Sequence, residues 1–146
     1  MAKMVKVGMA DLNICHSPDA ITTLGLGSCV GVALYDKNTK TAGLVHVMLP
    51  DSTKVRQNQN RAKFADTGID YLIELLEKEG AKKSSLTAKI AGGAQMFAFS
   101  SSNDMLRVGE RNVEAVKDKL KKLGIRILAE DTGLNYGRTV EFYPET

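Results

Sequence analysis

The fold is decided by residues 30–49, which run VGVALYDKNTKTAGLVHVML. Hydrophobic residues occupy every second position from Val30 to Leu34, and this period of two predicts a β-strand. A second strand is predicted over Gly43 to Leu49, and the polar residues Asp36 to Thr39 between the two strands predict a turn. Together these features predict a β-hairpin.

The predicted hairpin has a cysteine at its entrance and a histidine in its second strand. A two-residue turn at 37–38 pairs Asp36 with Thr39, and the same register, carried back along both strands, puts Cys29 opposite His46. A shift of two residues leaves Cys29 and His46 as diagonal neighbours on one face, whereas a shift of one residue separates them onto opposite faces. The hairpin is therefore expected to bring a thiol and an imidazole together on one face of a sheet.

The rest of the chain predicts short strands and two amphipathic helices in mixed order. In each helix, apolar residues recur three or four positions apart and a glycine follows the last turn. A turn is predicted over 13–19, where Ser-Pro-Asp occurs. We expect helices between Phe64 and Gly80 and between Val113 and Gly124, and further strands at Met4–Val7, Ala20–Leu24, Leu86–Ala91, Ile125–Ala129 and Thr139–Tyr143. This order predicts a single layered α/β or α+β domain over residues 1–146 and not a doubly wound sheet.

Length and composition are those of an ordinary globular domain. The chain has 146 residues, of which 43% are hydrophobic and 25% are charged, and this balance excludes a disordered chain. The net charge of +3 is too small to predict nucleic-acid binding. The densest basic run, residues 117–122, is interpreted as the solvated face of a helix, with a phosphate-binding patch as the alternative.

The sequence predicts no membrane segment. The N-terminus lacks the apolar region of a secretory signal. The longest uncharged stretch, Ala20 to Tyr35, is shorter than a membrane span and is broken by Gly, Ser and Thr. We therefore expect a cytoplasmic protein without direct membrane insertion.

The sequence predicts neither a metal site nor a cofactor site. It contains two Cys and two His without a Cys-x-x-Cys motif, which disfavours a zinc site and is too few for a disulfide framework. Gly25 and Gly27 resemble a phosphate-binding loop, but no Gly-Lys-Ser/Thr follows them. We expect reduced cysteines, no metal and no cofactor.

Cys29 and His46 are the candidate catalytic residues. Cys29 follows a Gly-x-Gly-Ser bend, which exposes a nucleophile and directs the backbone N–H groups of Ser28 and Cys29 at a developing oxyanion. Thr23 ends the preceding strand, where its hydroxyl or carbonyl is placed to orient an imidazole. A protonated imidazole beside the thiol would lower the thiol pKa and favour the thiolate. The alternative is structural: a small buried cysteine and a hydrogen-bonded histidine in the core.

Three other motifs are interpreted as structural. Cys15 and His16 are adjacent in an extended segment, so their side chains point in opposite directions. Gly92 and Gly93 are interpreted as a tight turn, with a place on the rim of the site as the alternative. Arg111 and Asn112 are interpreted as a contact at a helix N-terminus, with a place of the Gly109–Asn112 block on the rim of the site as the alternative.

The chain resembles the chemoreceptor glutamine deamidase family, CheD, over nearly its whole length. Each matching block alone is modest, but the blocks occur together and in the family's order. They are TTLGLGSCV (22–30), HVMLPDS (46–52), FADT (64–67), KIAGGAQMF (89–97), VGERN (108–112), AEDTG (129–133) and GR (137–138).

The resemblance implies a fold, a reaction and partners. The fold is a single-domain layered α/β sandwich with mixed sheets, similar to the catalytic domain of deamidating toxins. The family's catalytic triad maps onto Thr23, Cys29 and His46. Its reaction converts selected Gln side chains of methyl-accepting chemotaxis receptors to Glu and releases ammonia, and it also hydrolyses receptor glutamyl methyl esters. Family members also bind and stimulate the CheC phosphatase.

A thiol mechanism follows for such an enzyme. Cys29 attacks the Gln carboxamide carbon, and His46 protonates the departing ammonia and then activates a water that hydrolyses the thioester. Thr23 holds the imidazole in one tautomer and orientation. Two alternatives are a protein that mainly regulates CheC without catalysis of its own, and a different cysteine hydrolase such as a peptidase.

Overall fold

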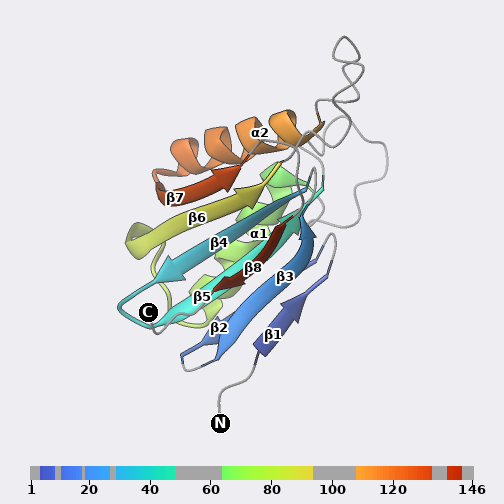
Figure 1. Cartoon of the computed structure of the whole chain (residues 1–146). Coiled ribbons are helices and arrows are strands. Elements are labelled where there is room, and N and C mark those ends of the chain that lie inside the picture. Colours follow the sequence, from blue (N-terminus) through green and yellow to red (C-terminus); the bar gives the residue numbers. More distant parts are fainter. Residues whose placement is uncertain are drawn as a thin grey trace.

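The structure is a computed structural model that describes residues 4–8, 11–17, 19–26, 29–48, 64–93, 108–132 and 138–142. These residues form strands and helices in mixed order, and a short 3₁₀ turn at Lys83–Ser85 precedes β6 (Figure 1). The elements are β1 (Met4–Val7), β2 (Leu12–His16), β3 (Ala20–Leu26), β4 (Val30–Asp36), β5 (Thr41–Val47), α1 (Ala65–Lys78), β6 (Leu86–Gly92), α2 (Val108–Leu123), β7 (Arg126–Thr132) and β8 (Arg138–Phe142). The strands and helices expected from the sequence are confirmed, and β2 is an additional strand.

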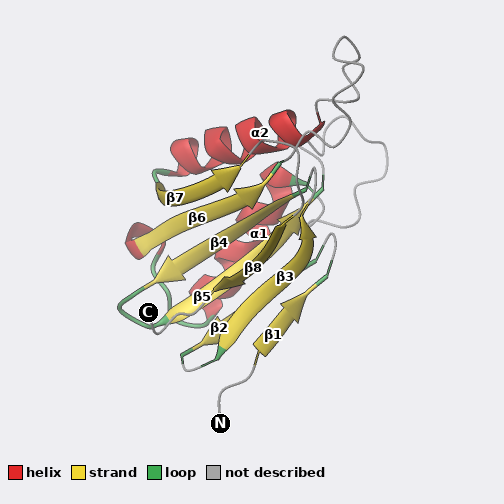
Figure 2. Cartoon of the chain, in the orientation of Figure 1, coloured by secondary structure: helices red, strands yellow, loops and turns green. Residues whose placement is uncertain are grey.

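The described strands form two sheets. The smaller sheet has the order β1-β3-β8 and the larger has the order β2-β5-β4-β6-β7. Both are mixed, because β1 runs parallel to β3 and β6 runs parallel to β7, whereas the other pairs are antiparallel. Figure 2 shows the smaller sheet stacked on one face of the larger sheet and the helices on the other. This arrangement confirms the layered α/β sandwich with mixed sheets.

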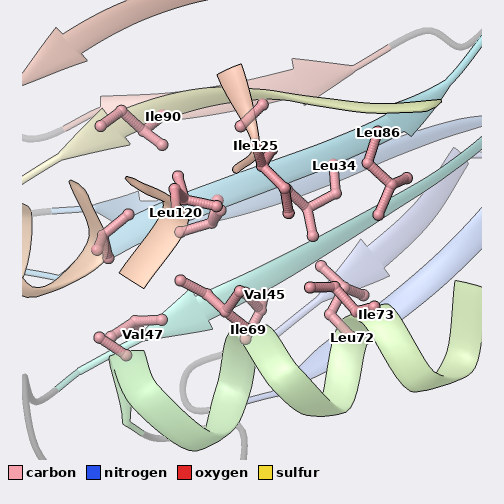
Figure 3. Close-up of a cluster of buried hydrophobic side chains, with 14 of the residues drawn as sticks. Leu34, Val45, Val47, Ile69, Leu72, Ile73, Leu86, Ile90, Leu120 and Ile125 are labelled. Atoms are coloured by element: carbon pink, nitrogen blue, oxygen red, sulfur yellow. The ribbon is translucent and has the colours of Figure 1, made fainter. Parts of the chain in front are cut away.

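Apolar side chains fill both interfaces of the larger sheet. Its helix-facing side contributes Val30, Val32 and Leu34 of β4 to a cluster that includes the buried faces of α1 and α2. Figure 3 shows Leu34 and Val45 among the side chains of the helices. The opposite side contributes alternate residues, among them Ala33, to a second cluster with Val7 and Ile21 of the smaller sheet. Alternation along β4 and β5 therefore sends odd and even positions to different layers.

The hairpin turn is longer than expected, and the predicted pairing of Asp36 with Thr39 is wrong. Asp36 pairs with Thr41, so residues 37–40 form a four-residue loop. Asn38 N donates to Asp36 Oδ1 at 2.9 Å, and Lys40 adopts a φ of 52°. The carboxylate organises the loop, and the register shifts by two residues from the prediction. A shift of two leaves every side chain on its expected face.

The unexpected strand β2 lies at the edge of the larger sheet. Its segment was predicted as a turn because Ser17 and the residues after it are turn formers. The strand has no clean polar alternation, since Leu12 and Ile14 pack toward the helices and Cys15 packs toward the smaller sheet. Contacts on both faces remove the period of two that identifies a strand with one buried face.

Both helices end where the sequence predicts, but α2 begins at Val108, ahead of the predicted Val113, because the apolar spacing that identifies the helix starts only at Val113. Gly80 and Gly124 follow their last turns with φ of 96° and 73°, in the left-handed region that favours glycine. Gly43 on β5 permits the close approach of α1, because a β-carbon there would overlap the side chain of Leu72. In the part of the chain that the structure describes, no helix has the length and apolar character of a membrane span.

Candidate active site

The candidate catalytic side chains lie between the two sheets, at the end where β3 and β5 finish and β4 begins. His46 occupies an even position of β5, as do Ala42 and Leu44, which face the smaller sheet. Thr23 of β3 shares the inward face of the smaller sheet with Ile21. Both side chains are buried, with exposed fractions of 0% for His46 and 1% for Thr23. The alternation of the two strands therefore directs the imidazole and the hydroxyl at each other.

A hydrogen-bond chain fixes the His46 ring. Thr23 Oγ1 lies 2.8 Å from His46 Nδ1 and donates to the carbonyl oxygen of Val7 on β1 at 2.8 Å. A threonine hydroxyl has a single hydrogen, and this hydrogen is used on Val7. The Thr23 oxygen must therefore accept a hydrogen bond from the Nδ1–H group of His46. The neutral ring carries its hydrogen on Nδ1 and a lone pair on Nε2.

His46 Nε2 is buried and has no hydrogen-bond partner among the described residues. A buried nitrogen without a partner is costly in a folded protein, and such groups occur at catalytic positions. The backbone N–H of His46 donates to the Asp11 carbonyl at 2.9 Å, which anchors this part of β5. The ring is thus fixed on one side and available to accept a proton on the other.

Cys29 lies one residue before β4, diagonal to His46. The observed register pairs Val30 with Val47 and Gly31 with His46. Continued by one residue, this register places Cys29 two positions along the ladder from His46, on the face that Gly31 shares. Gly31, the partner of His46 in the ladder, has no side chain. The same-face prediction for Cys29 and His46 is thus consistent with the register, and only the turn length differs.

The thiol of Cys29 is buried, with an exposed fraction of 8%. It makes no hydrogen bond to His46 Nε2 in this structure. Nucleophile–base hydrogen bonds are often long in enzymes without substrate and shorten in the substrate complex.

Burial shifts the pKa of each group toward its uncharged form. It raises the pKa of the Cys29 thiol above its ordinary value, and the residue's own backbone N–H opposes this rise. Burial also lowers the pKa of His46. These shifts favour the neutral thiol and the neutral imidazole over the thiolate–imidazolium pair expected from the sequence. The physical reason is desolvation, which disfavours the charged form of each group.

The second cysteine and histidine lie elsewhere. Cys15 is buried against the smaller sheet, whereas the His16 side chain is half-exposed and contacts Glu79 Oε1 at 2.9 Å. The two side chains point in opposite directions, as expected for neighbours in a strand. No group of three or more potential metal ligands occurs within the described ranges.

Asn112 has a structural role in α2. Its side chain is buried, and its Nδ2 donates to the carbonyl oxygen of Met48 at 2.9 Å. Met48 is the residue directly after β5, so this bond ties the exit of the strand carrying His46 to the helix layer. The sequence predicts a contact at the helix N-terminus, whereas Asn112 lies in the second turn of α2.

Some features of the site have no signal in the sequence, and one predicted residue is not described. Val7 and Asp11 accept the hydrogen bonds of Thr23 and His46 through their main-chain carbonyl groups. Every residue carries such a group, so the sequence does not identify these two acceptors. Ser28, predicted as an oxyanion donor, lies outside the described residues.

Comparison with known proteins gives consistent names over the whole chain. A family model described as CheD chemotactic sensory transduction matches residues 48–146. The chain is 71% identical to a probable chemoreceptor glutamine deamidase CheD of Lachnoclostridium phytofermentans, over 100% of this chain and 91% of that protein. It is 61% identical to the chemoreceptor glutamine deamidase CheD of Halalkalibacterium halodurans, over 100% and 91%, and 53% identical to that of Bacillus subtilis, over 99% and 88%.

A solved structure of a different family has a similar fold. The crystal structure of a Neisseria meningitidis protein of the DUF152 family aligns with a TM-score of 0.59 over 97% of this chain and 75% of that chain. Sequence identity is 9%, so the likeness concerns the fold alone.

Proposed function

Because the chain belongs to the CheD chemotactic sensory transduction family, we propose that it is a chemoreceptor glutamine deamidase that acts in the cytoplasm. It hydrolyses the side-chain amide of selected Gln residues of methyl-accepting chemotaxis receptors to Glu and releases ammonia. Residues 1–146 form the single catalytic domain. The names of the curated relatives support the reaction and the substrate class.

One observation carries the assignment of the catalytic residues. Thr23 occupies Nδ1 of a buried imidazole and leaves its Nε2 without a partner, on the sheet face where Cys29 precedes the neighbouring strand. A cysteine nucleophile requires a base that takes its proton, and the base requires a third group that orients it. Cys29, His46 and Thr23 supply these three functions.

The proposed mechanism begins from uncharged groups. The Cys29 sulfur attacks the carboxamide carbon of Gln while its proton moves to His46 Nε2, which forms a tetrahedral intermediate and an imidazolium. The imidazolium returns this proton to the departing nitrogen, the C–N bond breaks, and ammonia leaves a thioester on Cys29. Coupling the proton transfer to the attack avoids a stable ion pair in a desolvated site.

The second half of the reaction reuses the same base. His46 Nε2 takes a proton from water as the water oxygen attacks the thioester carbon. The new tetrahedral intermediate collapses, the C–S bond breaks, and the sulfur recovers the proton from the imidazolium. The products are Glu and free thiol.

The backbone N–H of Cys29 is the proposed donor to the oxyanion, together with that of Ser28. The N–H of Cys29 already favours negative charge at the Cys29 sulfur. Backbone donors that point at developing charge contribute strongly in acyl transfer.

Intact-mass and peptide-mapping experiments on cytoplasmic receptor fragments test the proposed reaction. The fragments are expected to gain the small mass of an NH₂-to-OH exchange at specific Gln residues. Backbone cleavage would instead identify a different cysteine hydrolase, and unchanged fragments would refute the proposal.

We propose binding and stimulation of the CheC phosphatase as a second role, which rests on the resemblance of the sequence to the CheD family. The two roles separate in a phosphatase assay with the parent and with Cys29→Ala. Stimulation by both proteins, together with Gln conversion by the parent alone, is the result expected. Stimulation without Gln conversion by either protein would identify a regulator, and absence of stimulation would refute this role.

A further inference from the structure

The strand β6 ends in two glycines whose backbones adopt positive φ. Gly92 has a φ of 107° and Gly93 a φ of 67°. L-amino acids rarely adopt such values, whereas glycine does so without steric cost. The sequence predicts a tight turn at these two residues, and the structure adds a contact of both with the main chain of Cys29.

Both glycines contact the main chain of Cys29. Gly93 N donates to the carbonyl oxygen of Cys29 at 2.8 Å. Gly92 pairs with Val30, and a β-carbon at Gly92 would overlap the Cys29 carbonyl oxygen and lie 3.2 Å from Val30 Cα. Two main chains therefore meet at the peptide bond that joins Cys29 to β4, and only a residue without a side chain fits between them.

This contact restrains Cys29 relative to His46. The peptide after Cys29 is held by β6 on one side, while Val30 pairs with Val47 of β5 on the other. His46 precedes Val47 and is anchored through its own backbone N–H. The positions of the two catalytic side chains are thus linked through three neighbouring strands.

The other described glycines of positive φ serve a different purpose. Gly80 and Gly124 follow the two helices, and a β-carbon at either position would meet no atom within 4 Å. A substitution at Gly80 or Gly124 meets backbone strain alone. A substitution at Gly92 meets strain and also displaces the Cys29 carbonyl.

We propose that Gly92 and Gly93 are positioning residues that hold the main chain of Cys29, so that its sulfur reaches the bare Nε2 of His46. This inference rests on the proposed function in taking Cys29 as the nucleophile and His46 as its base. The two glycines meet Cys29 at its carbonyl group, and they take no part in the proposed chemistry.

A double-mutant cycle with iodoacetamide as the probe tests the inference. The alkylation rate of Cys29 at pH 7 is measured by peptide mapping in the parent, Gly92→Ala, His46→Ala and the double variant, with Cys15 as an internal reference thiol. In the parent background, His46→Ala is expected to lower the alkylation rate of Cys29 about tenfold or more, because the thiol loses its proton acceptor. In the Gly92→Ala background the same change is expected to have less than about a twofold effect, since coupled sites are non-additive.

Gly80→Ala is the matched control, because it places alanine at a similar φ without contact. The His46→Ala effect is expected to keep its full size in this background. A folded Gly92→Ala variant that keeps the full His46→Ala effect would overturn the inference. The inference would also be overturned if His46→Ala left the alkylation rate of Cys29 unchanged in the parent. Cys29 and His46 would then not be coupled, and the glycines could not maintain a coupling.

The readout distinguishes this inference from the proposed function. Alkylation needs no glutamine substrate. A protein with the expected cycle that converts no receptor Gln would refute the deamidase and leave the positioning role intact. Gln conversion by a protein in which the effects of Gly92→Ala and His46→Ala are additive would support the deamidase and refute the positioning role.

Amide hydrogen exchange on the parent provides a second measurement that does not depend on the folding of a variant. The Gly93 amide is expected to exchange as slowly as the interior amides of β6, because it donates to Cys29. Exchange at the rate of a solvent-exposed amide would overturn the inference.

Discussion

The molecule contains two cysteine–histidine pairs, and only one of them has the arrangement of a catalytic site. His46 is fully buried, bound at Nδ1 by Thr23 and bare at Nε2. The His16 side chain is 48% exposed, and both of its nitrogens have partners, Thr41 Oγ1 at 3.2 Å and Glu79 Oε1 at 2.9 Å. A ring occupied on both sides cannot take a proton from a thiol without losing a bond.

The two cysteines differ in a related way. Cys15 is the penultimate residue of β2, and burial, with a contribution from the nearby charge of Asp19, raises its thiol pKa to about 11. Cys29 precedes a strand and lies on the same face as the imidazole of the adjacent strand. Proximity along the chain therefore predicts less than proximity across a ladder, because adjacent residues of a strand face opposite layers.

The largest difference is expected between the two cysteine variants. Cys29→Ala removes the nucleophile and should lower the rate of receptor Gln conversion by at least about a thousandfold. Cys15→Ala should keep that rate within about twofold, while loss of buried volume costs roughly 1 kcal/mol of stability. Initial rates from mass spectrometry and urea unfolding separate the two effects. Equal activity of Cys29→Ala and the parent would remove Cys29 from the mechanism.

The histidine variants should differ by a smaller factor. His46→Ala is expected to lower the rate by about 10²- to 10⁴-fold, the usual contribution of a general base. His16→Ala removes an exposed contact to Glu79, so it should change stability by less than about 1 kcal/mol and leave the rate unchanged. The same rate assay and urea unfolding provide the measurement. Rapid thioester formation in His46→Ala would contradict its role as the base.

The tautomer of His46 depends on Thr23. Thr23→Val removes the acceptor for Nδ1–H at nearly constant volume, and we expect kcat to fall roughly ten- to hundredfold because the ring loses its orientation. Thr23→Ser keeps the hydroxyl and should recover most of the activity. Nitrogen-15 NMR of histidine-labelled protein should show the Nδ1–H form in the parent and in Thr23→Ser. An Nε2–H form in the parent would contradict the hydrogen-bond chain.

The smallest expected effect is the pH dependence of stability. Because the pKa of His46 is lowered in the folded state, the unfolded chain binds the proton first, and stability should decrease as the pH falls below the ordinary value of 6.5. Because the thiol pKa of Cys15 is raised, the unfolded chain loses its proton first, and stability should decrease between pH 9.0 and about 11. Urea unfolding across this pH range measures both changes in stability.

Matched variants show which residue causes the decrease in stability at acid pH (the acid limb) and which causes the decrease at alkaline pH (the alkaline limb). His46→Ala should weaken the acid limb and Cys15→Ala the alkaline limb, whereas His16→Ala should leave both in place. An acid limb that is unchanged in His46→Ala would show that other groups produce it.

Several features of the fold and the site follow from sequence patterns. The alternation of β4 and β5 predicts Cys29 and His46 on one face, and the observed register, shifted by two residues, is consistent with this prediction. The turn length was wrong because Asp36 accepts a bond from Asn38 N and stabilises a longer loop. The sequence pattern did not distinguish these two loop lengths.

Which residues share a face follows from the order of the amino acids, because side chains alternate along a strand whatever the strand packs against. The packing of the layers sets which nitrogen of His46 has no partner among the described residues, the direction in which the pKa values of Cys29 and His46 shift, and the contact of Gly92 with the carbonyl of Cys29. These properties depend on main-chain groups and on burial between layers. Main-chain groups are the same in every residue, and burial exists only once the two sheets and the helices have packed together.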